Sequence, residues 1–198
     1  STAEALRIVR TNLEFLLNEV PEGIAKTIFL TSTFPKEGKT FISVNLASTI
    51  ALSDKKVLLL GLDIRNPKLE EYLDVPKVGV TNYLASKDHK NSADFLTKVE
   101  GFSNFYVMPA GVIPPNPAEL LMGKKVGELF EKLKQEFDYI IVDTAPVSLV
   151  TDTLLISKYA DAFVYVTRAN YLDKRMLTLP EKLYQEKKLP NMSILIND

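Results

Sequence analysis

The residues of this sequence best suited to chemistry lie in one short stretch, TFPKEGKT at positions 33–40. An apolar, β-branched run at 26–32 precedes it, and residues 40–51 follow with apolar side chains at helical spacing. Where a buried strand leads through a tight loop into a helix, backbone N–H groups and the helix dipole bind anions. Lys39 would reach the outer phosphates of a nucleotide, and the hydroxyl of Thr40 would bind Mg²⁺. The stretch therefore predicts a phosphate-binding loop.

The other residues of this loop are expected to surround the phosphates mainly through their backbone amides. They are Lys36, Glu37, Gly38 and Phe41, together with Pro35, which lines the loop but has no N–H to donate. Only Gly38 supplies backbone freedom, because Thr33 stands where such loops usually begin with glycine. The alternative is a plain strand–turn–helix connection with a chance Gly-Lys-Thr, and the flanking pattern favours the phosphate site over it.

Two acidic residues that follow other apolar runs are candidates for the metal side of such a site. Asp143 ends the run 139–143, where a carboxylate at the edge of a sheet would face Mg²⁺; the alternative is a residue that caps the next turn. Asp63 follows the run 57–61, and its carboxylate would order metal-bound water or act on an incoming hydroxyl. Arg65 would neutralise phosphate, or would instead form a weak surface pair with Asp63.

Composition narrows the classes of function. The chain has 198 residues, 46% hydrophobic and 25% charged, which suits one domain with a full core. A net charge of −1 encodes no bulk attraction to nucleic acid, and the absence of cysteine excludes thiolate chemistry. The only histidine, His89, is expected in a solvated loop. No apolar run approaches the ~20 residues that cross a bilayer. The sequence opens without methionine and stops after an apolar run, so we expect one domain of a longer protein.

Strand-like and helix-like segments alternate along the whole sequence. The predicted strands are 27–32, 57–61, 105–109, 139–143, 162–167 and 193–196. The predicted helices are 3–17, 40–52, 124–137, 151–159 and 173–188, with Pro180 expected to kink or restart the last one. Continuous apolar strands are typical of a parallel sheet with helices on both faces. The sequence therefore predicts a single α/β domain over residues 1–198, with ligands at the carboxyl ends of its strands.

These segments together resemble the bacterial tyrosine kinases, or BY-kinases, a family of P-loop ATPases. The Walker A, Walker A′ and Walker B motifs of that family match residues 33–40, 58–65 and 140–144. The segment PPNPAELL at 114–121 is also typical of these kinases. In it, Asn116 is expected to cap the helix that follows. A fourth match is Glu4-x-x-Arg7-x-x-Arg10, a pattern that the family uses to pack subunits into a ring.

The arginines of this fourth motif would meet carboxylates of a neighbouring subunit through forked hydrogen bonds. The alternative is an intrahelical pair on a solvated face of helix 3–17. Three-residue steps keep Glu4, Arg7 and Arg10 near one side of a helix. The resemblance favours the subunit interface.

The resemblance implies a P-loop NTPase-like fold and an ATP- and Mg²⁺-dependent protein tyrosine kinase. Lys39, Asp63 and Asp143 would be catalytic, Thr40 would join the two acids in organising Mg²⁺, and Asn197 would contact adenine. The acceptor would be a tyrosine in the tail of an adjacent subunit, a tail that this chain lacks. The process served would be synthesis and export of capsular or extracellular polysaccharide. A transmembrane activator, the polysaccharide co-polymerase, fused or separate, would hold the domain in the cytoplasm at the inner face of the membrane.

Two residues depart from the family pattern. Gly61 replaces the first acid of Walker A′, which is commonly proposed to deprotonate the tyrosine, and Lys36 replaces a glycine. Because of Gly61, one alternative is that the domain binds nucleotide and assembles but is catalytically silent. A switch ATPase of the partition or septum-positioning kind is a further alternative. Phe34, however, stands where those proteins carry a characteristic lysine.

Overall fold

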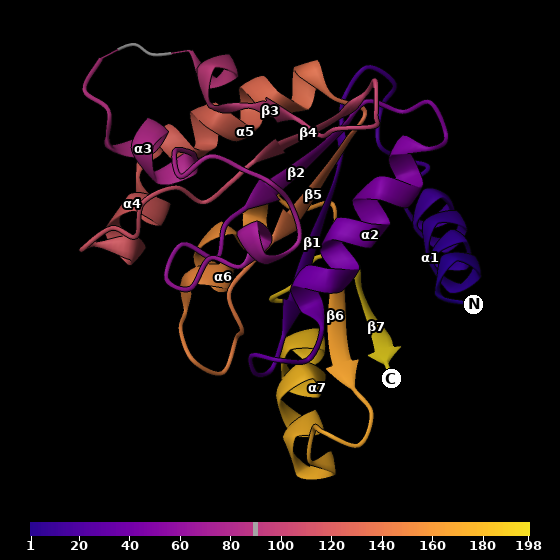
Figure 1. Ribbon diagram of the computed structural model, residues 1–198. Helices are drawn as coiled ribbons and strands as arrows, with labels where there is room; N and C mark the ends of the chain where they lie inside the picture. The colour runs from indigo at the N-terminus through magenta and orange to yellow at the C-terminus, as the bar shows by residue number, and fades with distance from the viewer. Residues whose placement is uncertain (89–90) are drawn as a thin grey trace.

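A seven-stranded sheet forms the centre of the computed structural model, which describes residues 1–88 and 91–198 (Figure 1). The strand order is β3-β4-β2-β5-β1-β6-β7, and all neighbours pair parallel except β3 with β4. The strands are β1 (Lys26–Ser32), β2 (Val57–Gly61), β3 (Thr97–Lys98), β4 (Phe105–Met108), β5 (Tyr139–Asp143), β6 (Ala162–Arg168) and β7 (Met192–Asn197). All six predicted strands are confirmed, and the expectation for His89 lies outside the described residues.

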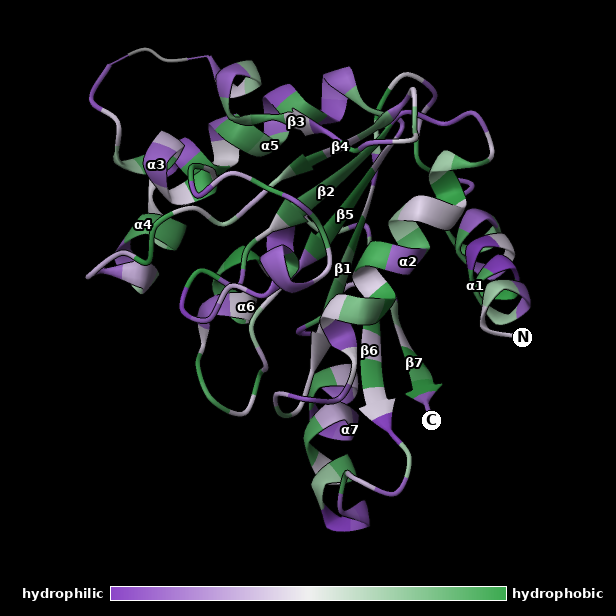
Figure 2. Cartoon of the chain, in the orientation of Figure 1, coloured by the Kyte–Doolittle hydropathy of each residue, from purple (hydrophilic) through white to green (hydrophobic). Residues whose placement is uncertain are grey.

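Helices cover both faces of this sheet, as the sequence predicts. They are α1 (Thr2–Leu16), α2 (Lys39–Ala51), α3 (Val80–Ala85), α4 (Pro117–Met122), α5 (Lys124–Glu136), α6 (Asp152–Ile156) and α7 (Thr178–Gln185). Short 3₁₀ turns are η1 (Leu69–Glu71), η2 (Ser92–Phe95), η3 (Ser157–Tyr159) and η4 (Lys174–Leu177). One buried cluster packs α1 and α2 against one face of the sheet. The other packs α3, α4, α5, α6 and α7 against the opposite face. Figure 2 shows the apolar strands between these layers.

Register explains why residues far apart in sequence meet at one edge. In the central strands, Leu30 of β1 and Gly61 of β2 both lie beside Asp143 of β5. Because all three strands are parallel, the loops that follow them leave the sheet at the same edge. The loop at 33–40, Asp63 and Asp143 are therefore neighbours.

Two local predictions had different outcomes. The helix predicted at 173–188 is divided into η4 and α7, and Pro180 lies in the first turn of α7, where its missing N–H leaves no hydrogen bond unmade. The cap predicted for Asn116 is wrong: it precedes α4 without a side-chain capping bond. Its Nδ2 instead donates to Oε2 of Glu119 at 3.2 Å.

Among the described residues, none of the helices combines the length and the apolar character needed to cross a bilayer.

Candidate nucleotide-binding and phosphoryl-transfer site

The loop between β1 and α2 turns back on itself at two residues with left-handed backbone. Gly38, the N-cap of α2, has φ of 89°, and Lys36 has φ of 68°. A Cβ at Gly38 would overlap the side-chain amide of Asn197, whose Nδ2 donates to the carbonyl of Glu37 at 3.1 Å. The left-handed backbone therefore favours glycine at position 38, and any side chain there would have to displace the amide of Asn197. At position 36 the same conformation is held by a lysine, which explains why the family pattern has glycine there.

The side chain of Glu37 braces this loop from within. It is 1% exposed. Its carboxylate accepts hydrogen bonds from the backbone N–H of Phe34 at 2.9 Å and of Arg168, in β6, at 3.2 Å. Glu37 is thus placed to hold the loop against β6, and its own side chain does not line the cavity described below. Phe41 does not line it either; its ring packs beside Tyr72, with centroids 6.3 Å apart.

Asp143 is the centre of a buried polar cluster at the end of β5. Its Oδ1 accepts from Nζ of Lys39 at 2.5 Å, and its Oδ2 from Oγ1 of Thr40 at 2.9 Å. Oγ of Ser43, one helical turn beyond Lys39, also approaches Oδ1, at 3.3 Å. The side chains of Lys39 and Asp143 are 7% and 3% exposed, so the pair is held out of water. The sequence analysis missed Ser43, although its spacing from Lys39 puts it on the same face of α2.

Asp63 has a different environment. Its carboxylate accepts a hydrogen bond from the backbone N–H of Asn66 at 3.2 Å. Within the described part of the chain it forms no ion pair and no side-chain hydrogen bond. Burial raises the pKa of this carboxyl, and the charge of Lys39 opposes the rise. Asp63 is therefore a carboxylate beside the phosphate loop that is bonded by backbone N–H and paired with no side chain of the described residues.

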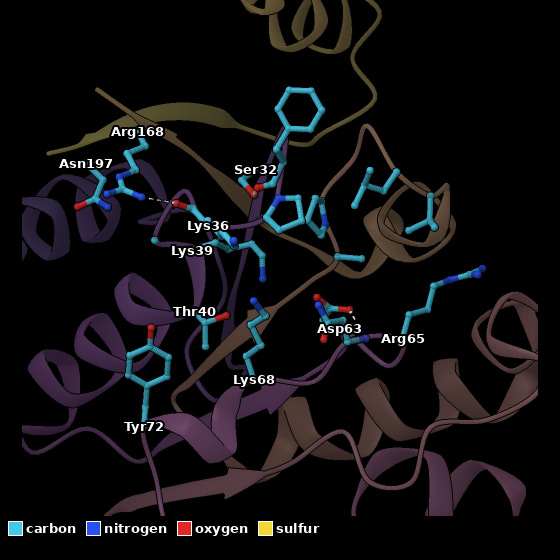
Figure 3. Close-up of a pocket in the computed structure, with 18 of the residues that line it drawn as sticks. Ser32, Lys36, Lys39, Thr40, Asp63, Arg65, Lys68, Tyr72, Arg168 and Asn197 are labelled. Atoms are coloured by element: carbon cyan, nitrogen blue, oxygen red, sulfur yellow. Dashed lines mark hydrogen bonds between the residues drawn. The ribbon is translucent and has the colours of Figure 1, made fainter. Parts of the chain in front are cut away.

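Arg65 does not pair with Asp63, so that alternative is wrong. Its Nε and Nη2 donate to Oδ2 and Oδ1 of Asp152 at 2.7 and 3.0 Å. The side chain of Asp152, the first residue of α6, is 1% exposed. Figure 3 shows Arg65 extending away from Asp63. The sequence analysis missed Asp152, which no local pattern marks as a partner.

A cavity of about 470 Å³ lies over these groups, a size typical of small-molecule sites. Of the predicted nucleotide-binding residues, it is lined by Pro35, Lys36, Gly38, Lys39, Thr40, Arg65 and Asn197. Asp63 lines it too, and Asp143 lies beneath Lys39 and Thr40. Lys68, which the sequence analysis missed, extends toward Lys39 (Figure 3). The lining includes the cationic side chains of Lys36, Lys39, Arg65, Lys68 and Arg168, which suit an anion such as a nucleotide. Asn197 lies against the loop, where its Nδ2 donates to the carbonyl of Glu37.

The donor set fits Mg²⁺ rather than a transition metal. No cluster of three or more His, Cys, Asp or Glu side chains able to hold a metal occurs among the residues that the structure describes. Mg²⁺ is usually bound by one or two carboxylates together with water and substrate phosphates. The oxygens of Thr40, Asp63 and Asp143 would provide such a partial shell.

The predicted interface residues lie on α1. Arg7 is exposed, and the side chain of Glu4 is 75% exposed, with its carboxylate near the terminal amino group. Nε of Arg10 is 3.8 Å from Oε1 of Glu14 and is buried without a hydrogen-bond partner in the described chain. α1 therefore presents Glu4 and Arg7 outward and keeps Arg10 partly buried.

The fold and the site define a P-loop nucleotide-binding domain, and comparisons with known proteins agree. A family model described as an AAA domain matches residues 26–175. Tyrosine-protein kinase wzc of Salmonella typhimurium is 35% identical over 83% of this chain and 22% of its own length. Tyrosine-protein kinase CpsD of Streptococcus agalactiae is 31% identical over 99% of this chain and 83% of its own. The solved kinase domain of Escherichia coli ETK matches with a TM-score of 0.88 at 32% identity, covering 100% of this chain and 75% of that chain.

The chain belongs to the family of bacterial tyrosine-protein kinases. It spans 22% of the Salmonella kinase and 26% of tyrosine-protein kinase ptk from Acinetobacter johnsonii, so it corresponds to one part of those longer proteins. The septum site-determining protein MinD of Pyrococcus horikoshii has a TM-score of 0.69 at 20% identity, a likeness that shows the fold alone.

Proposed function

We propose that this chain is the ATP-dependent kinase domain of a bacterial protein tyrosine kinase that phosphorylates tyrosines of a neighbouring copy. By its family, the process it serves is synthesis and export of capsular or extracellular polysaccharide. The observation that carries the proposal is the division between two carboxylates at one sheet edge. Asp143 accepts hydrogen bonds from the side chains of Lys39, Thr40 and Ser43, whereas within the described residues Asp63 is bonded only by backbone N–H and lines the same cavity.

The chemistry follows from that division. Lys39 and the first amides of α2 bind the phosphates of ATP, and Asp143 holds Lys39 and Thr40 in place. The tyrosine oxygen forms a bond to the γ-phosphorus while the bond to the bridging oxygen breaks, and the electron pair leaves with ADP. Asp63 receives the phenolic proton. The loose transition state needs little activation of the nucleophile, so the missing acid at Gly61 does not prevent transfer.

Mg²⁺ belongs to the proposal as the partner of ATP. Held by Thr40, Asp63 and Asp143 together with phosphate oxygens, it would neutralise charge on the phosphates. Asn197, at the end of β7, also lines the cavity and would contact the base.

The assembly in the proposal is a ring-like homo-oligomer. Glu4, Arg7 and Arg10 on α1 would contact the neighbouring copy, whose tyrosine-rich tail supplies the acceptor. The further partner is a transmembrane activator, fused or separate, which places the domain in the cytoplasm at the inner membrane face. A net charge of −1 argues against nucleic acid as a partner.

Mass spectrometry of the full-length protein incubated with ATP and Mg²⁺ tests the proposal. We expect phosphotyrosine, and we expect it to be lost in Lys39→Met and in Asp63→Asn, which unpairs no buried ion. Lys188→Met is the control, at an exposed lysine that does not line the nucleotide cavity, and should retain the modification. ATP hydrolysis coupled to dimerisation without phosphotyrosine would favour a switch ATPase. Nucleotide binding and oligomers without any transfer would favour the silent assembly module.

A further inference from the structure

The backbone carbonyls of the phosphate loop are all bonded within the protein. Each carbonyl from position 33 to position 38 accepts a hydrogen bond. In the order of these positions, the donors are the hydroxyls of Ser148, Ser32 and Tyr171, the guanidinium of Arg168, the side-chain amide of Asn197 and the N–H of Ile42. We call these donors the loop frame. Because most of them are side chains, the frame depends on particular residues.

The N–H groups on the other side of the same peptide units are unused. In a trans peptide, the N–H of one residue points away from the carbonyl of the residue before it. Among the residues that the structure describes, none accepts a hydrogen bond from the N–H groups of Lys36, Glu37 and Gly38. By binding the carbonyls at positions 35–37, the loop frame therefore turns these three N–H groups away from itself. Such a row of unpaired N–H groups is what a phosphate requires.

The turn that follows β6 carries the outer part of the loop frame. Oη of Tyr171 donates to the carbonyl of Pro35 at 3.1 Å. Nη1 of Arg168 donates to the carbonyl of Lys36 at 3.0 Å, a bond that Figure 3 draws. The guanidinium carbon of Arg168 lies 5.3 Å from the centre of the Tyr171 ring, so the two donors also hold one another. Since Arg168 is the last residue of β6, the pair is anchored in the sheet.

Tyr171 differs from Arg168 in its relation to the cavity. Arg168 lines the nucleotide cavity and is itself available to a phosphate. Tyr171 does not line it, and its side chain is 46% exposed. Within the described part of the chain, its hydroxyl bonds only to the carbonyl of Pro35. Any effect of this hydroxyl on nucleotide binding must therefore pass through the loop backbone.

We propose that Tyr171 is a positioning residue for the phosphates of the nucleotide. With Arg168 beside it, Tyr171 fixes the peptide units that follow Pro35 and Lys36 before the nucleotide arrives. Without this bond, binding would have to order these units, and the lost conformational entropy would weaken the affinity. The inference rests on the proposed function, because it requires that the loop binds a nucleotide.

Titration of the chain with ADP and Mg²⁺ tests this role. Tyr171→Phe removes the hydroxyl and keeps the ring beside Arg168, so it isolates the bond to Pro35. We expect a dissociation constant for ADP about fivefold higher than that of the unmodified chain, the effect of one hydrogen bond. In the kinase reaction, the KM for ATP should rise by the same factor with kcat unchanged.

The matched control is Tyr184→Phe. Tyr184 lies in α7, is 63% exposed, does not line the nucleotide cavity, and its hydroxyl has no hydrogen-bond partner among the described residues. Its variant should bind ADP like the unmodified chain. ADP binding that is equally tight in Tyr171→Phe and in the unmodified chain would overturn the positioning role and leave the kinase proposal intact.

A measurement without nucleotide covers the case in which the chain binds no ADP. NMR relaxation of the nucleotide-free protein gives order parameters for the amides of Lys36, Glu37 and Gly38. We expect values near those of α2 in the unmodified chain and in Tyr184→Phe, and lower values in Tyr171→Phe. This pattern in a chain that binds no ADP would contradict the proposed function and support the loop frame. Order parameters unaffected by Tyr171→Phe would overturn the role of Tyr171.

Discussion

The guanidinium of Arg65 turns away from Asp63, two residues before it, and forms a two-point ion pair with Asp152 at the start of α6. The pair joins the segment after β2 to the segment after β5. Asp63 lies in the first of these segments, and Asp143 is the last residue of β5, directly before the second. Arg65 therefore acts on Asp63 through the backbone, by fixing where that strand end lies.

Removing this pair should destabilise the fold. Arg65→Gln leaves Asp152 buried without its cation, and we expect the free energy of unfolding to fall by about 2 kcal/mol. Urea unfolding of Arg65→Gln and of the unmodified protein measures this difference in the free energy of unfolding. Because Asp152→Asn removes the stranded charge, the double variant should be more stable than the sum of the two single effects. Strict additivity would show that the pair does not act as a unit.

Ser43 should contribute to the cluster around Asp143 without being essential. The hydroxyl of Ser43 shares its one proton between the carbonyl of Lys39 at 2.8 Å and Oδ1 of Asp143 at 3.3 Å. Ser43→Ala removes both contacts, and Asp143 keeps Lys39 and Thr40, so we expect a loss of about 1 kcal/mol in unfolding free energy. Thermal unfolding measures the loss of stability in Ser43→Ala. The control variant is Ser48→Ala, because the hydroxyl of Ser48 bonds only within α2. Equal losses of unfolding free energy in the two variants would show that the contact of Ser43 with Asp143 adds no stability.

Lys36 holds a left-handed conformation that glycine adopts without strain. Lys36→Gly should therefore raise the free energy of unfolding by up to about 1 kcal/mol, after the added entropy of the unfolded glycine is subtracted. The carbonyl of residue 36 keeps its bond from Arg168 in the variant. Differential scanning calorimetry would record the gain as a higher Tm. A lower Tm would mean that the lysine side chain itself supports the loop.

Alkaline pH should weaken the fold through two buried phenols. Burial raises the pKa of Tyr165 to about 12 and that of Tyr139 to about 12, while an unfolded tyrosine ionises near 10. The native state then holds more protons than the unfolded state between these values, so stability is complete below pH 10 and falls as pH rises toward 12. Tyr165→Phe should reduce this slope in denaturant titrations across pH 9 to 12. If the dependence of the unfolding free energy on pH were the same in Tyr165→Phe, groups other than Tyr165 would cause the loss of stability.

The sequence predicted the parts of the site that follow directly from strand ends. Continuous apolar runs identify β1, β2 and β5, and parallel pairing brings the residues after them to one edge. The phosphate loop, Asp63 and Asp143 were found in this way. The proximity of Lys39 to Asp143 follows from the same logic.

Other features depend on contacts that no local pattern encodes. Arg65 bonds to Asp152, which is 87 residues away in the sequence. Glu37 accepts from the N–H of Arg168, which is 131 residues away. β3 and α3 are too short for their periodicity to stand out. The cap predicted for Asn116 is wrong because the side chain is turned so that Nδ2 donates to the Glu119 carboxylate, while its oxygen accepts no bond from the first turn of α4. The sequence shows which residues reach the sheet edge, and tertiary packing decides how their side chains pair.

Isothermal titration calorimetry with ATP and Mg²⁺ tests the central claim most directly. We expect exothermic, saturable binding to the unmodified chain, loss of that heat in Lys39→Met, and its retention in Lys188→Met, a variant of an exposed lysine outside the cavity. Circular dichroism would verify that the Lys39 variant is folded. An unmodified, folded chain that gives no heat with ATP and Mg²⁺ would contradict the account.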